Sequence, residues 1–309
     1  PPPPGPEAGR RRTRRRARRR PERITPAPRG REQGVVTGGG HDGAVKVTPR
    51  RKALLMGEVK NGALAAAGPV LRPARARWWQ GPLVGFDLET TGTDPAESRI
   101  VTAALVDAVG SEPVRTTRWL LDPGVPIPEQ ARAIHGISDE QARTRGRPPA
   151  AAVEEIAAAL CARLAEGIPV VAFNAPFDLS LLDAELRRHG RPGLSERSAA
   201  RQVAPVLDAL VIDRAVDRYR KGSRGLGHVC QVYGVELLDA HEAAADALAA
   251  VRVAVALGER YPAEVGEQSP AALHERQVGW YRDWAEGLQS WLRQGKDPQA
   301  VVDARWPMR

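Results

Sequence analysis

The sequence predicts an α/β fold in which a three-strand meander is followed by parallel strands, giving a mixed sheet flanked by helices. Two observations lead to this prediction. Short apolar or alternating runs come first, separated by turn-forming stretches such as Thr91-Gly-Thr-Asp-Pro95. From Ala151 onward the hydrophobic period becomes helical, and helices then alternate with short strands.

The expected elements follow these runs in chain order. The meander strands are expected at Leu83–Glu89, Ile100–Val109 and Arg115–Leu121. Pro176 suits the first turn of a helix that follows a buried strand. The remaining expected elements are the helix Ala151–Glu166, the strand Pro169–Phe173, the helix Pro176–His189, the strand Val206–Ile212, and the helices Leu226–Tyr233, Ala240–Leu257 and Ala271–Arg293.

The net charge of +9 is concentrated at one end of the 309-residue chain. Residues 1–32 hold twelve Arg and three Glu, so residues 33–309 carry 34 basic and 34 acidic residues. Residues 1–80 are rich in Arg, Pro and Gly, which predicts a disordered N-terminal extension. Such a block can bind phosphates, act as a targeting signal or simply remain solvated. We expect a folded domain over residues 81–262 and a helical C-terminal extension over residues 263–309.

No run approaches the roughly 18 apolar residues that span a bilayer, and no apolar segment follows the Arg block. We therefore expect a soluble, cytoplasmic protein without membrane contact. Cys161 and Cys230 have no Cys-x-x-Cys or Cys/His spacing, which argues against a zinc site or a disulfide framework. We expect both to be reduced core residues.

The segment Gly85-Phe-Asp-Leu-Glu-Thr-Thr-Gly92 carries two acidic residues on the first expected strand. Side chains two residues apart on a strand share a face, so Asp87 and Glu89 project together while Leu88 points the other way. Carboxylates on a strand that otherwise reads as core are costly unless they are paired or bound to cations. The segment therefore predicts that these two acids are paired or bind a cation, although Asp-x-Glu alone is a weak signal, since Asp183-Ala-Glu185 repeats it in an expected helix.

Two later segments carry further candidate groups. Asp178, in Phe173-Asn-Ala-Pro-Phe-Asp178, follows an apolar strand at the edge where open α/β sheets place ligands; an acid there also complements a helix N-terminus. His241 and Asp246 are five residues apart, which is about 140° on a continuous helix. We therefore expect His241 in the turn before the helix and Asp246 on its inward face.

In order, spacing and context, these four carboxylates and one imidazole resemble the DEDDh family of 3′→5′ exonucleases, which includes the proofreading subunit of bacterial replicative DNA polymerase. The resemblance extends from about Gly81 to Tyr261 and includes Ile134–Glu140. It implies a ribonuclease H-like fold and an exonuclease domain over residues 81–262. The chain also looks like free-standing exonuclease-domain proteins of high-GC bacteria, whose appendage ends in a Trp-Pro such as Trp306-Pro307.

The resemblance also implies roles for individual residues. The implied ligands of two Mg²⁺ or Mn²⁺ ions are Asp87, Glu89, Asp178 and Asp246. His241 is the implied general base of a hydrolysis that releases nucleoside 5′-monophosphates. The implied contacts to the terminal nucleotide are Thr90, Thr91, His135 and Phe177. An ordinary position in the hydrophobic core would explain Phe177 equally well.

The leading hypothesis is a metal-dependent 3′→5′ exonuclease acting on single-stranded or frayed DNA 3′ ends. An exoribonuclease or oligoribonuclease is the alternative within the family, because relatives with the same five residues degrade RNA and the choice rests on the 2′-OH. A non-catalytic nucleic-acid-binding module is disfavoured because all five positions are filled. Association with a DNA polymerase stays open, since no polymerase or clamp-binding motif is recognisable.

The C-terminal segment carries an apolar stripe at helical spacing. Its members are Trp280, Trp284, Leu288, Trp291 and Leu292. This spacing favours a helix that docks onto the domain. The alternative is a stacking platform for single strands, since His274, Arg276, Arg282 and Arg293 lie beside the aromatic residues.

Overall fold

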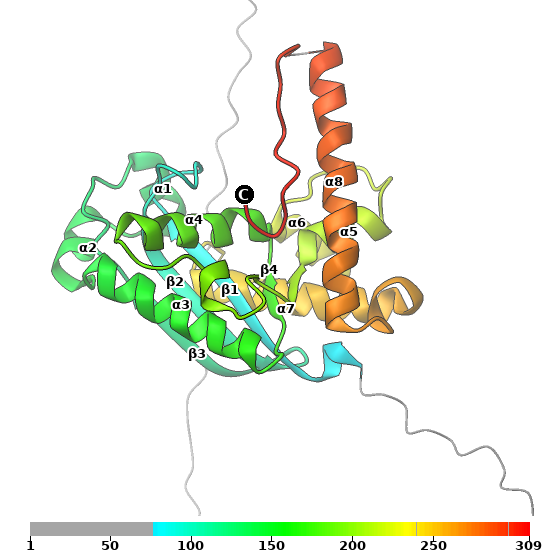
Figure 1. The fold of residues 1–309 in the computed structure, drawn as a ribbon, viewed down its shortest axis with the longest axis horizontal. Helices are drawn as coiled ribbons and strands as arrows, with labels where there is room; N and C mark the ends of the chain where they lie inside the picture. Colours follow the sequence, from blue (N-terminus) through cyan, green and yellow to red (C-terminus); the bar gives the residue numbers. More distant parts are fainter. Residues whose placement is uncertain (1–76, 239, 296) are drawn as a thin grey trace, which may run out of the picture. The chain divides into compact units, whose positions relative to one another are not determined.

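The computed structural model describes residues 77–238, 240–295 and 297–309. Within them lies a five-stranded mixed sheet in the order β3-β2-β1-β4-β5 (Figure 1). The strands are β1 (Pro82–Thr90), β2 (Ile100–Val109), β3 (Glu112–Leu120), β4 (Val170–Ala172) and β5 (Val206–Asp208). β1, β2 and β3 pair antiparallel, whereas β4 pairs parallel with β1 and β5 parallel with β4. The predicted meander followed by parallel strands is confirmed.

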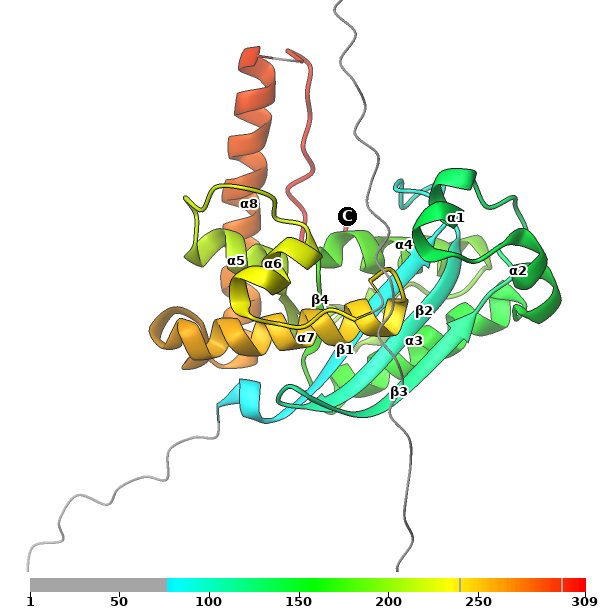
Figure 2. The same ribbon diagram turned by 180° about the vertical axis from the view of Figure 1, so that it is seen from behind.

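Helices cover both faces of the sheet. α7 lies on one face, and α3 and α4 lie on the other (Figures 1 and 2). The α-helices are α1 (Glu129–His135), α2 (Asp139–Arg145), α3 (Pro149–Ala165), α4 (Ala175–Arg188), α5 (Ala209–Val216), α6 (Leu226–Tyr233), α7 (Ala243–Arg260) and α8 (Pro270–Gly295). The shorter turns are the 3₁₀ helices η1 (Trp78–Gln80) and η2 (Ser195–Arg197) and the π-helical turn η3 (Pro262–Gly266).

β1 is apolar on both faces because helices cover both faces. Val84, Phe86 and Leu88 belong to the large core cluster that α3 and α4 complete. Leu83 points the other way and packs in the cluster that contains α7. By this alternation, Asp87 and the other odd-numbered residues of β1 lie on the face covered by α7.

The expected strand Val206–Ile212 is wrong beyond Asp208. β5 ends there, and the buried residues that follow form α5. The carboxylate of Asp208 accepts hydrogen bonds from the backbone N–H groups of Leu210 and Val211, which makes it the N-cap of α5. A short run that is buried on all sides has the same apolar pattern in a helix and in a strand, so periodicity could not separate them.

Residues 77–80, which the sequence places in the N-terminal extension, are described. Trp78 and Trp79 of η1 are only 8% and 9% exposed. The indole Nε1 of Trp78 donates to the carbonyl of Val265 at 3.1 Å, and a Cβ at Gly258 would lie 2.5 Å from the Trp79 ring. η1 therefore packs against α7 and η3. The predicted disorder of residues 1–76 lies outside the described residues and stays a prediction.

The C-terminal segment packs on the edge of the sheet. The Val206 N–H donates to Nδ1 of His274, and the side chain of Gln277 bonds both the Asp208 N–H and the Val206 carbonyl. After α8 the chain turns back along the helix toward α4 (Figure 1). There Trp306 Nε1 approaches the Asp208 carboxylate at 3.5 Å. Side chains of α8 thus take the place of a further strand beside β5.

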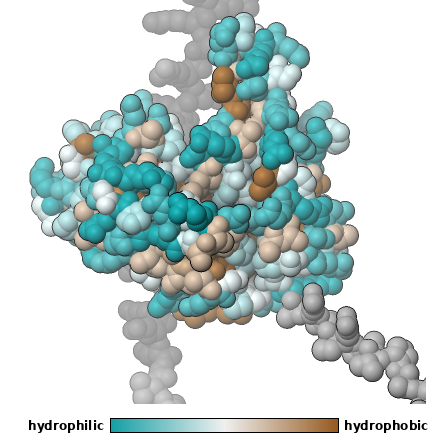
Figure 3. Space-filling view, viewed as in Figure 1, coloured by the Kyte–Doolittle hydropathy of each residue, from teal (hydrophilic) through white to brown (hydrophobic). Residues whose placement is uncertain are grey.

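The surface shown in Figure 3 is largely hydrophilic, with scattered hydrophobic residues. Among the described helices, none combines the length and apolar character that crossing a membrane requires. Both cysteines are free, as expected; Cys230 is buried and Cys161 is half-buried.

Candidate active site

Asp87 and Glu89 occupy the carboxyl end of β1. Opposite them on β2 lie Ala104 and Thr102, respectively. Cross-strand neighbours share a face, so these small side chains leave space beside the two carboxylates. The β1–β2 register shifts directly after Glu89. The two acids therefore stand at the point where regular pairing ends and the chain opens into a turn.

Close packing of α7 on β1 brings a third carboxylate to this point. A Cβ at Gly85 would lie 2.5 Å from the carbonyl oxygen of Ala247 and 2.9 Å from a methyl group of Val251. Only glycine permits this approach. Asp246 lies in the first turn of α7, one residue before Ala247, so the same contact holds Asp246 beside Asp87 and Glu89.

The bend before α7 brings His241 and Asp246 together. His241 has φ of +71°, which is uncommon for a residue other than glycine, and Glu242 is the N-cap of α7. The His241 N–H donates to Oδ2 of Asp246 at 3.3 Å. One ligand atom from each of Glu89, His241 and Asp246 lies within 4.8 Å of the other two. The placement of His241 in a turn before the helix is confirmed.

Asp178 reaches the site from the opposite face of the sheet. It lies in the first turn of α4, directly after β4, and is only 3% exposed. Asn174, with φ of +74°, turns the chain from β4 into α4. The backbone of Leu88 hydrogen-bonds the Asp178 carboxylate, which places this carboxylate against the segment between Asp87 and Glu89.

The carboxylates raise the pKa of one another. Burial is the largest cause of the raised pKa of Asp87, followed by the charges of Asp178 and Asp246. Burial, then the charges of Asp246 and Glu242, raises the pKa of Glu89 from 4.5 to about 8. Burial also raises the pKa of Asp178 and of Asp246. Full ionisation of this cluster is therefore unfavourable unless a cation compensates it.

The donor set fits a hard divalent cation. Oδ1 of Asp246 is buried and has no hydrogen-bond partner, so a strong acceptor is left without a donor. Carboxylate oxygens are preferred ligands of Mg²⁺ and similar cations. Glu89 and His241 offer further ligand atoms within 4.8 Å, and Asp87 and Asp178 adjoin them. The site predicted from the sequence is thus assembled from β1, α4 and the start of α7.

A cavity of about 220 Å³ opens beside Glu89 and His241. His135, one of the predicted substrate contacts, lines it. Its Nδ1 accepts from a backbone N–H at 3.1 Å, and its Nε2 is buried without a hydrogen-bond partner. Arg118 and Arg145 line the same cavity. The cavity therefore combines an unsatisfied imidazole with two cations that suit a phosphate.

Arg118 and Glu242 are site residues that the sequence reasoning missed. Nε of Arg118 donates to Oε1 of Glu242 at 3.0 Å. Glu242 also caps α7 and raises the pKa of Asp87, Glu89 and Asp246. In the sequence, Glu242 could have been predicted from its position next to His241. No sequence pattern marks Arg118, because only the antiparallel pairing of β3 and β2 brings it to the site.

Three other predicted substrate contacts lie outside this cavity. Thr91 Oγ1 accepts from the Arg99 N–H, and the Thr91 N–H donates to the Arg99 carbonyl. The Thr90 hydroxyl donates to a backbone carbonyl in the same turn at 2.7 Å. Phe177 is half-buried against the main core. Their contact with a substrate stays a prediction.

Asp208 holds the turn that presents Asp178. Its carboxylate is fully buried and accepts from the N–H groups of Asn174 and Ala175 at 3.0 and 2.8 Å, while also capping α5. Burial raises the pKa of Asp208, and these backbone donors oppose that rise. One buried carboxylate thus fixes the β4–α4 turn and the β5–α5 turn together.

Comparison with protein families decides the class of the domain. Residues 84–254, more than half of the chain, match the model of the exonuclease family RNase_T. The chain belongs to this exonuclease family. Within the matched range lie all five predicted catalytic residues, Asp87, Glu89, Asp178, His241 and Asp246.

Curated relatives of this exonuclease domain include polymerases. A DNA polymerase III PolC-type from Streptococcus thermophilus is 29% identical over 171 residues, covering 55% of this chain and 11% of the relative. Its counterpart from Caldanaerobacter subterraneus is 26% identical over 203 residues, covering 64% and 13%. The chain therefore spans a small part of the length of the curated relatives it matches.

Solved structures of exonuclease I share the fold of this exonuclease domain. One exonuclease I structure has a TM-score of 0.52 and 22% identity, covering 66% of this chain and 44% of that one. E. coli exonuclease I in complex with a dT13 oligonucleotide has a TM-score of 0.51 and 23% identity, covering 60% and 42%. The predicted ribonuclease H-like fold is confirmed by this similarity.

Proposed function

We propose that the protein is a metal-dependent 3′→5′ exonuclease that hydrolyses single-stranded or frayed DNA 3′ ends to nucleoside 5′-monophosphates. One observation carries the proposal. Glu89, His241 and Asp246 converge within 4.8 Å, next to Asp87 and Asp178, in an exonuclease-family domain. Four acids and an imidazole, of which Glu89 and His241 line a cavity, suit phosphodiester hydrolysis better than a purely structural role.

The four carboxylates are the proposed ligands of two Mg²⁺ or Mn²⁺ ions. Asp178 is the most deeply buried of them, whereas His241 is exposed at the outer rim. When bound, the ions would supply Lewis-acid activation of water and of the leaving 3′ oxygen. Arg118 and Arg145 in the cavity are placed to neutralise a phosphate of the terminal nucleotide.

His241 is the proposed general base. The bond from its backbone N–H to Asp246 fixes the bend, so the imidazole stays next to the carboxylates while it remains open to solvent. A ring nitrogen there can accept the proton of the attacking water and pass it to bulk solvent. The buried, unpaired Nε2 of His135 is proposed to bond the terminal nucleotide, which would satisfy it.

The proposed substrates come from the relatives. Exonuclease I has been solved with the oligonucleotides dT13 and dA16, and the PolC-type relatives are DNA polymerases. We propose a single-stranded DNA 3′ end as the substrate and a DNA polymerase as a partner. RNA is included in the test as the competing substrate. Whether the pocket accepts or excludes a 2′-OH decides between RNA and DNA.

The test uses 3′-tailed DNA and a matched RNA, each labelled at the 5′ end, with Mn²⁺ or with EDTA. We expect a metal-dependent ladder that shortens from the 3′ end. Asp87→Ala should lower kcat by about 10³-fold, because several kcal/mol of charge stabilisation are lost. Glu166→Ala, which removes an exposed acid at the end of α3, is the control and should leave kcat unchanged.

Faster shortening of RNA would replace the DNA substrate by RNA within the same mechanism. No shortening of either polymer with any divalent cation, together with intact binding, would favour the non-catalytic binding module. Equal rates for Asp87→Ala and Glu166→Ala would remove the carboxylate cluster from the mechanism.

A further inference from the structure

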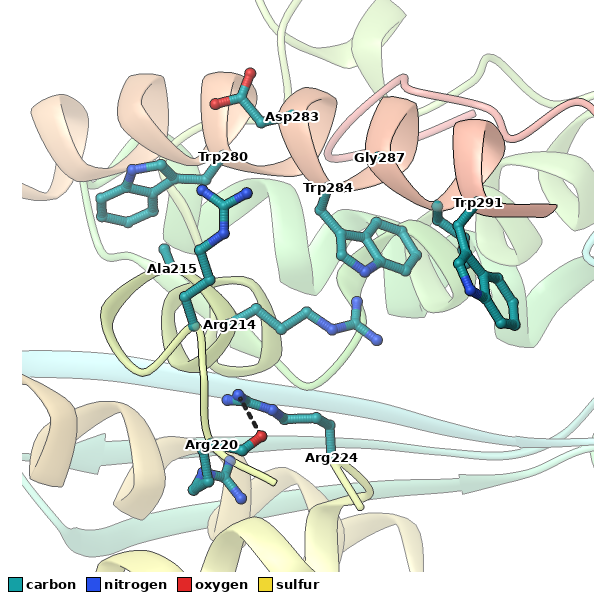
Figure 4. Close-up of a pocket in the computed structure, with 11 residues that line it drawn as sticks. Arg214, Ala215, Arg220, Arg224, Trp280, Asp283, Trp284, Gly287 and Trp291 are labelled. Atoms are coloured by element: carbon teal, nitrogen blue, oxygen red, sulfur yellow. Dashed lines mark hydrogen bonds between the residues drawn. The ribbon is translucent and has the colours of Figure 1, made fainter. Parts of the chain in front are cut away.

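A second hollow, of about 770 Å³, lies between α8 and the segment that begins with α5. It shares no lining residue with the cavity at His135. One wall consists of residues from successive turns of α8, and the other consists of arginines (Figure 4). The residues that define this Arg/Trp groove are Arg214, Arg218, Arg220, Arg224, Trp280, Trp284, Leu288 and Trp291.

Within the part of the chain that the structure describes, two arginines of the groove form ion pairs with a carboxylate, and two do not. Arg220 and Arg224 bond the carboxylate of Asp213, which is completely buried behind them. Among the described residues, no carboxylate lies within ion-pair distance of Arg214 or Arg218. Burial is the largest cause of the lowered pKa of Arg214, and the nearby charges of Asp208 and Asp213 offset it only in part. The groove can therefore still gain from an anion.

The tryptophans present flat apolar faces along the same groove. Trp280 and Trp284 are half-buried and pack against the core, which confirms the predicted docking of α8. The guanidinium of Arg214 lies 4.1 Å from the centroid of the Trp284 ring. Trp291 is 55% exposed and continues the row (Figure 4). Indole rings and guanidinium groups thus lie along one surface, with one guanidinium stacked on one ring.

Exposed aromatic residues concentrate here. Among the described residues, the exposed large hydrophobic side chains include two aromatic ones, Tyr219 at 88% and Trp291 at 55%. The guanidinium of Arg218, which lines the groove, lies 6.0 Å from the Tyr219 ring centroid. Both exposed rings therefore adjoin the groove. Water-exposed aromatic side chains beside cations are characteristic of surfaces that stack nucleic-acid bases.

The topology connects this groove to the carboxylates. β1, β4 and β5 are parallel neighbours, so their carboxyl ends meet at one edge of the sheet. The carboxylates lie at the ends of β1 and β4, and α5 starts at the end of β5. Two strand spacings and the length of α5 together amount to on the order of 20 Å. A few nucleotides of an extended strand cover such a distance.

We propose that the Arg/Trp groove binds the single-stranded segment that lies 5′ of the nucleotide being removed. Its bases stack on Trp291 and Tyr219, and its phosphates bond Arg214 and Arg218. This proposal rests on the proposed exonuclease function and adds a site for the body of the strand. An acidic peptide would satisfy the guanidinium groups but offers no flat bases to the exposed rings, so a polynucleotide fits better.

The test compares Arg218→Ala/Trp291→Ala with Arg191→Ala/Val114→Ala. All four side chains are exposed, so both variants should fold, and the control removes an arginine and an apolar residue elsewhere. The full chain is titrated in EDTA against labelled oligothymidylate of about 20 nucleotides and against an abasic strand of equal length. Salt of about 0.3 M weakens the phosphate contacts of the N-terminal Arg block.

We expect the wild type and the control to prefer oligothymidylate to the abasic strand. Arg218→Ala/Trp291→Ala should weaken oligothymidylate binding by about 10-fold and lose the preference, because a stacking platform is gone. The Arg block contacts both strands alike, so it cancels in the ratio of the two affinities. Equal preference in the groove variant and the control would overturn the proposal. So would polyglutamate that competes as well as unlabelled oligothymidylate at equal charge.

Binding and turnover separate this proposal from the proposed function. If the wild type fails to shorten oligothymidylate with Mn²⁺ but the groove variant loses base-dependent binding, the groove stands and the exonuclease function fails. If the wild type shortens the strand and the groove variant binds it as tightly as the control, the function stands and the groove assignment fails. With both correct, the groove variant should raise KM for the long strand about 10-fold and leave dinucleotide hydrolysis unchanged.

Discussion

The carboxylate site and the Arg/Trp groove are opposite in charge and in construction. The site gathers four acids onto the edge of a rigid sheet, where burial and mutual repulsion raise their pKa values. The groove gathers guanidinium groups and indole rings between two helices, one of which lies outside the family-matched residues. One region repels a polyanion until cations arrive, whereas the other attracts it without them.

The difference separates two tasks that a nuclease must perform. A strand cannot be held by carboxylates alone, because phosphates and carboxylates repel. Cations at the site offset this repulsion for the reacting phosphate only, because charge interactions are screened within about 10 Å in solution. Affinity for the rest of the strand therefore has to come from another surface. Changes in the sheet should alter catalysis, and changes in the groove should alter binding.

Among changes outside the carboxylates themselves, the largest effect is expected from a methyl group between β1 and α7. Gly85→Ala would place a Cβ 2.5 Å from the Ala247 carbonyl oxygen and so displace Asp246 from β1. We expect a loss of about 1–3 kcal/mol in the free energy of unfolding and of about 10²-fold in kcat. Gly279→Ala on α8 meets nothing within 4 Å. It should stabilise by roughly 0.5–1 kcal/mol.

Urea unfolding and oligonucleotide hydrolysis measure these two effects. If Gly85→Ala retained full activity, the close approach of α7 would not control the position of the carboxylates. If Gly279→Ala lowered the free energy of unfolding more than Gly85→Ala, α8 rather than the β1–α7 contact would be the region that does not tolerate an added methyl group.

The next effect, on stability alone, is expected from divalent cations, and its sign follows from the raised pKa values. Glu89 titrates near 8 in the fold and near 4.5 when unfolded, so the folded state holds a proton that the unfolded state has lost. The metal-free protein should therefore lose stability as pH rises from about 4.5 to 8. Saturating Mn²⁺ should restore about 2.7 kcal/mol, raising Tm by roughly 5–10 °C.

Thermal melts with Mn²⁺ or EDTA between pH 5 and 9 measure this stabilisation. The gain from Mn²⁺ should be larger at pH 8 than at pH 5, because protonated carboxylates are poor ligands. Glu89→Gln is the control and should flatten the pH dependence of the metal-free melt. A melt that Mn²⁺ leaves unchanged at pH 8 would argue against a cation site.

The smallest effect is expected from an acid on α8. Asp283 lines the Arg/Trp groove and projects away from the arginines (Figure 4). Asp283→Asn removes a repelling charge at an exposed position, so strand affinity should rise about two- to threefold at low salt. The kcat for a dinucleotide should stay constant. Fluorescence anisotropy measures the strand affinity. Weaker binding by Asp283→Asn would count against strand contact at this surface.

Most of the fold could be predicted because alternation and apolar runs depend on neighbours in the sequence. β1, β2 and α6 lie close to their predicted bounds. The prediction missed α5 because its N-terminus is marked only by hydrogen bonds to the Asp208 side chain. The apolar run around Asp208 gives no sign of these bonds. The short helices α1 and α2 were also missed, because they have too few turns to show a hydrophobic period.

The candidate site was predictable where local constraints decide the placement. The five-residue spacing of His241 and Asp246 required a bend, and the bend is present. Arg118 and Asp208 could not be found in this way, since the sheet register and the turn after β4 place them. The groove depends on packing between α5 and α8, so no local pattern could have assigned its arginines.

The side chains of α8 that bond β5 also affect how the molecules behave toward one another. An uncovered edge strand is a template on which a strand from a second molecule can add. His274 and Gln277 occupy the backbone groups of Val206 and Asp208 that such a strand would need. The C-terminal segment therefore protects the β5 edge of the sheet against self-association. Weakening its docking should favour aggregation at concentrations where the intact protein stays dispersed.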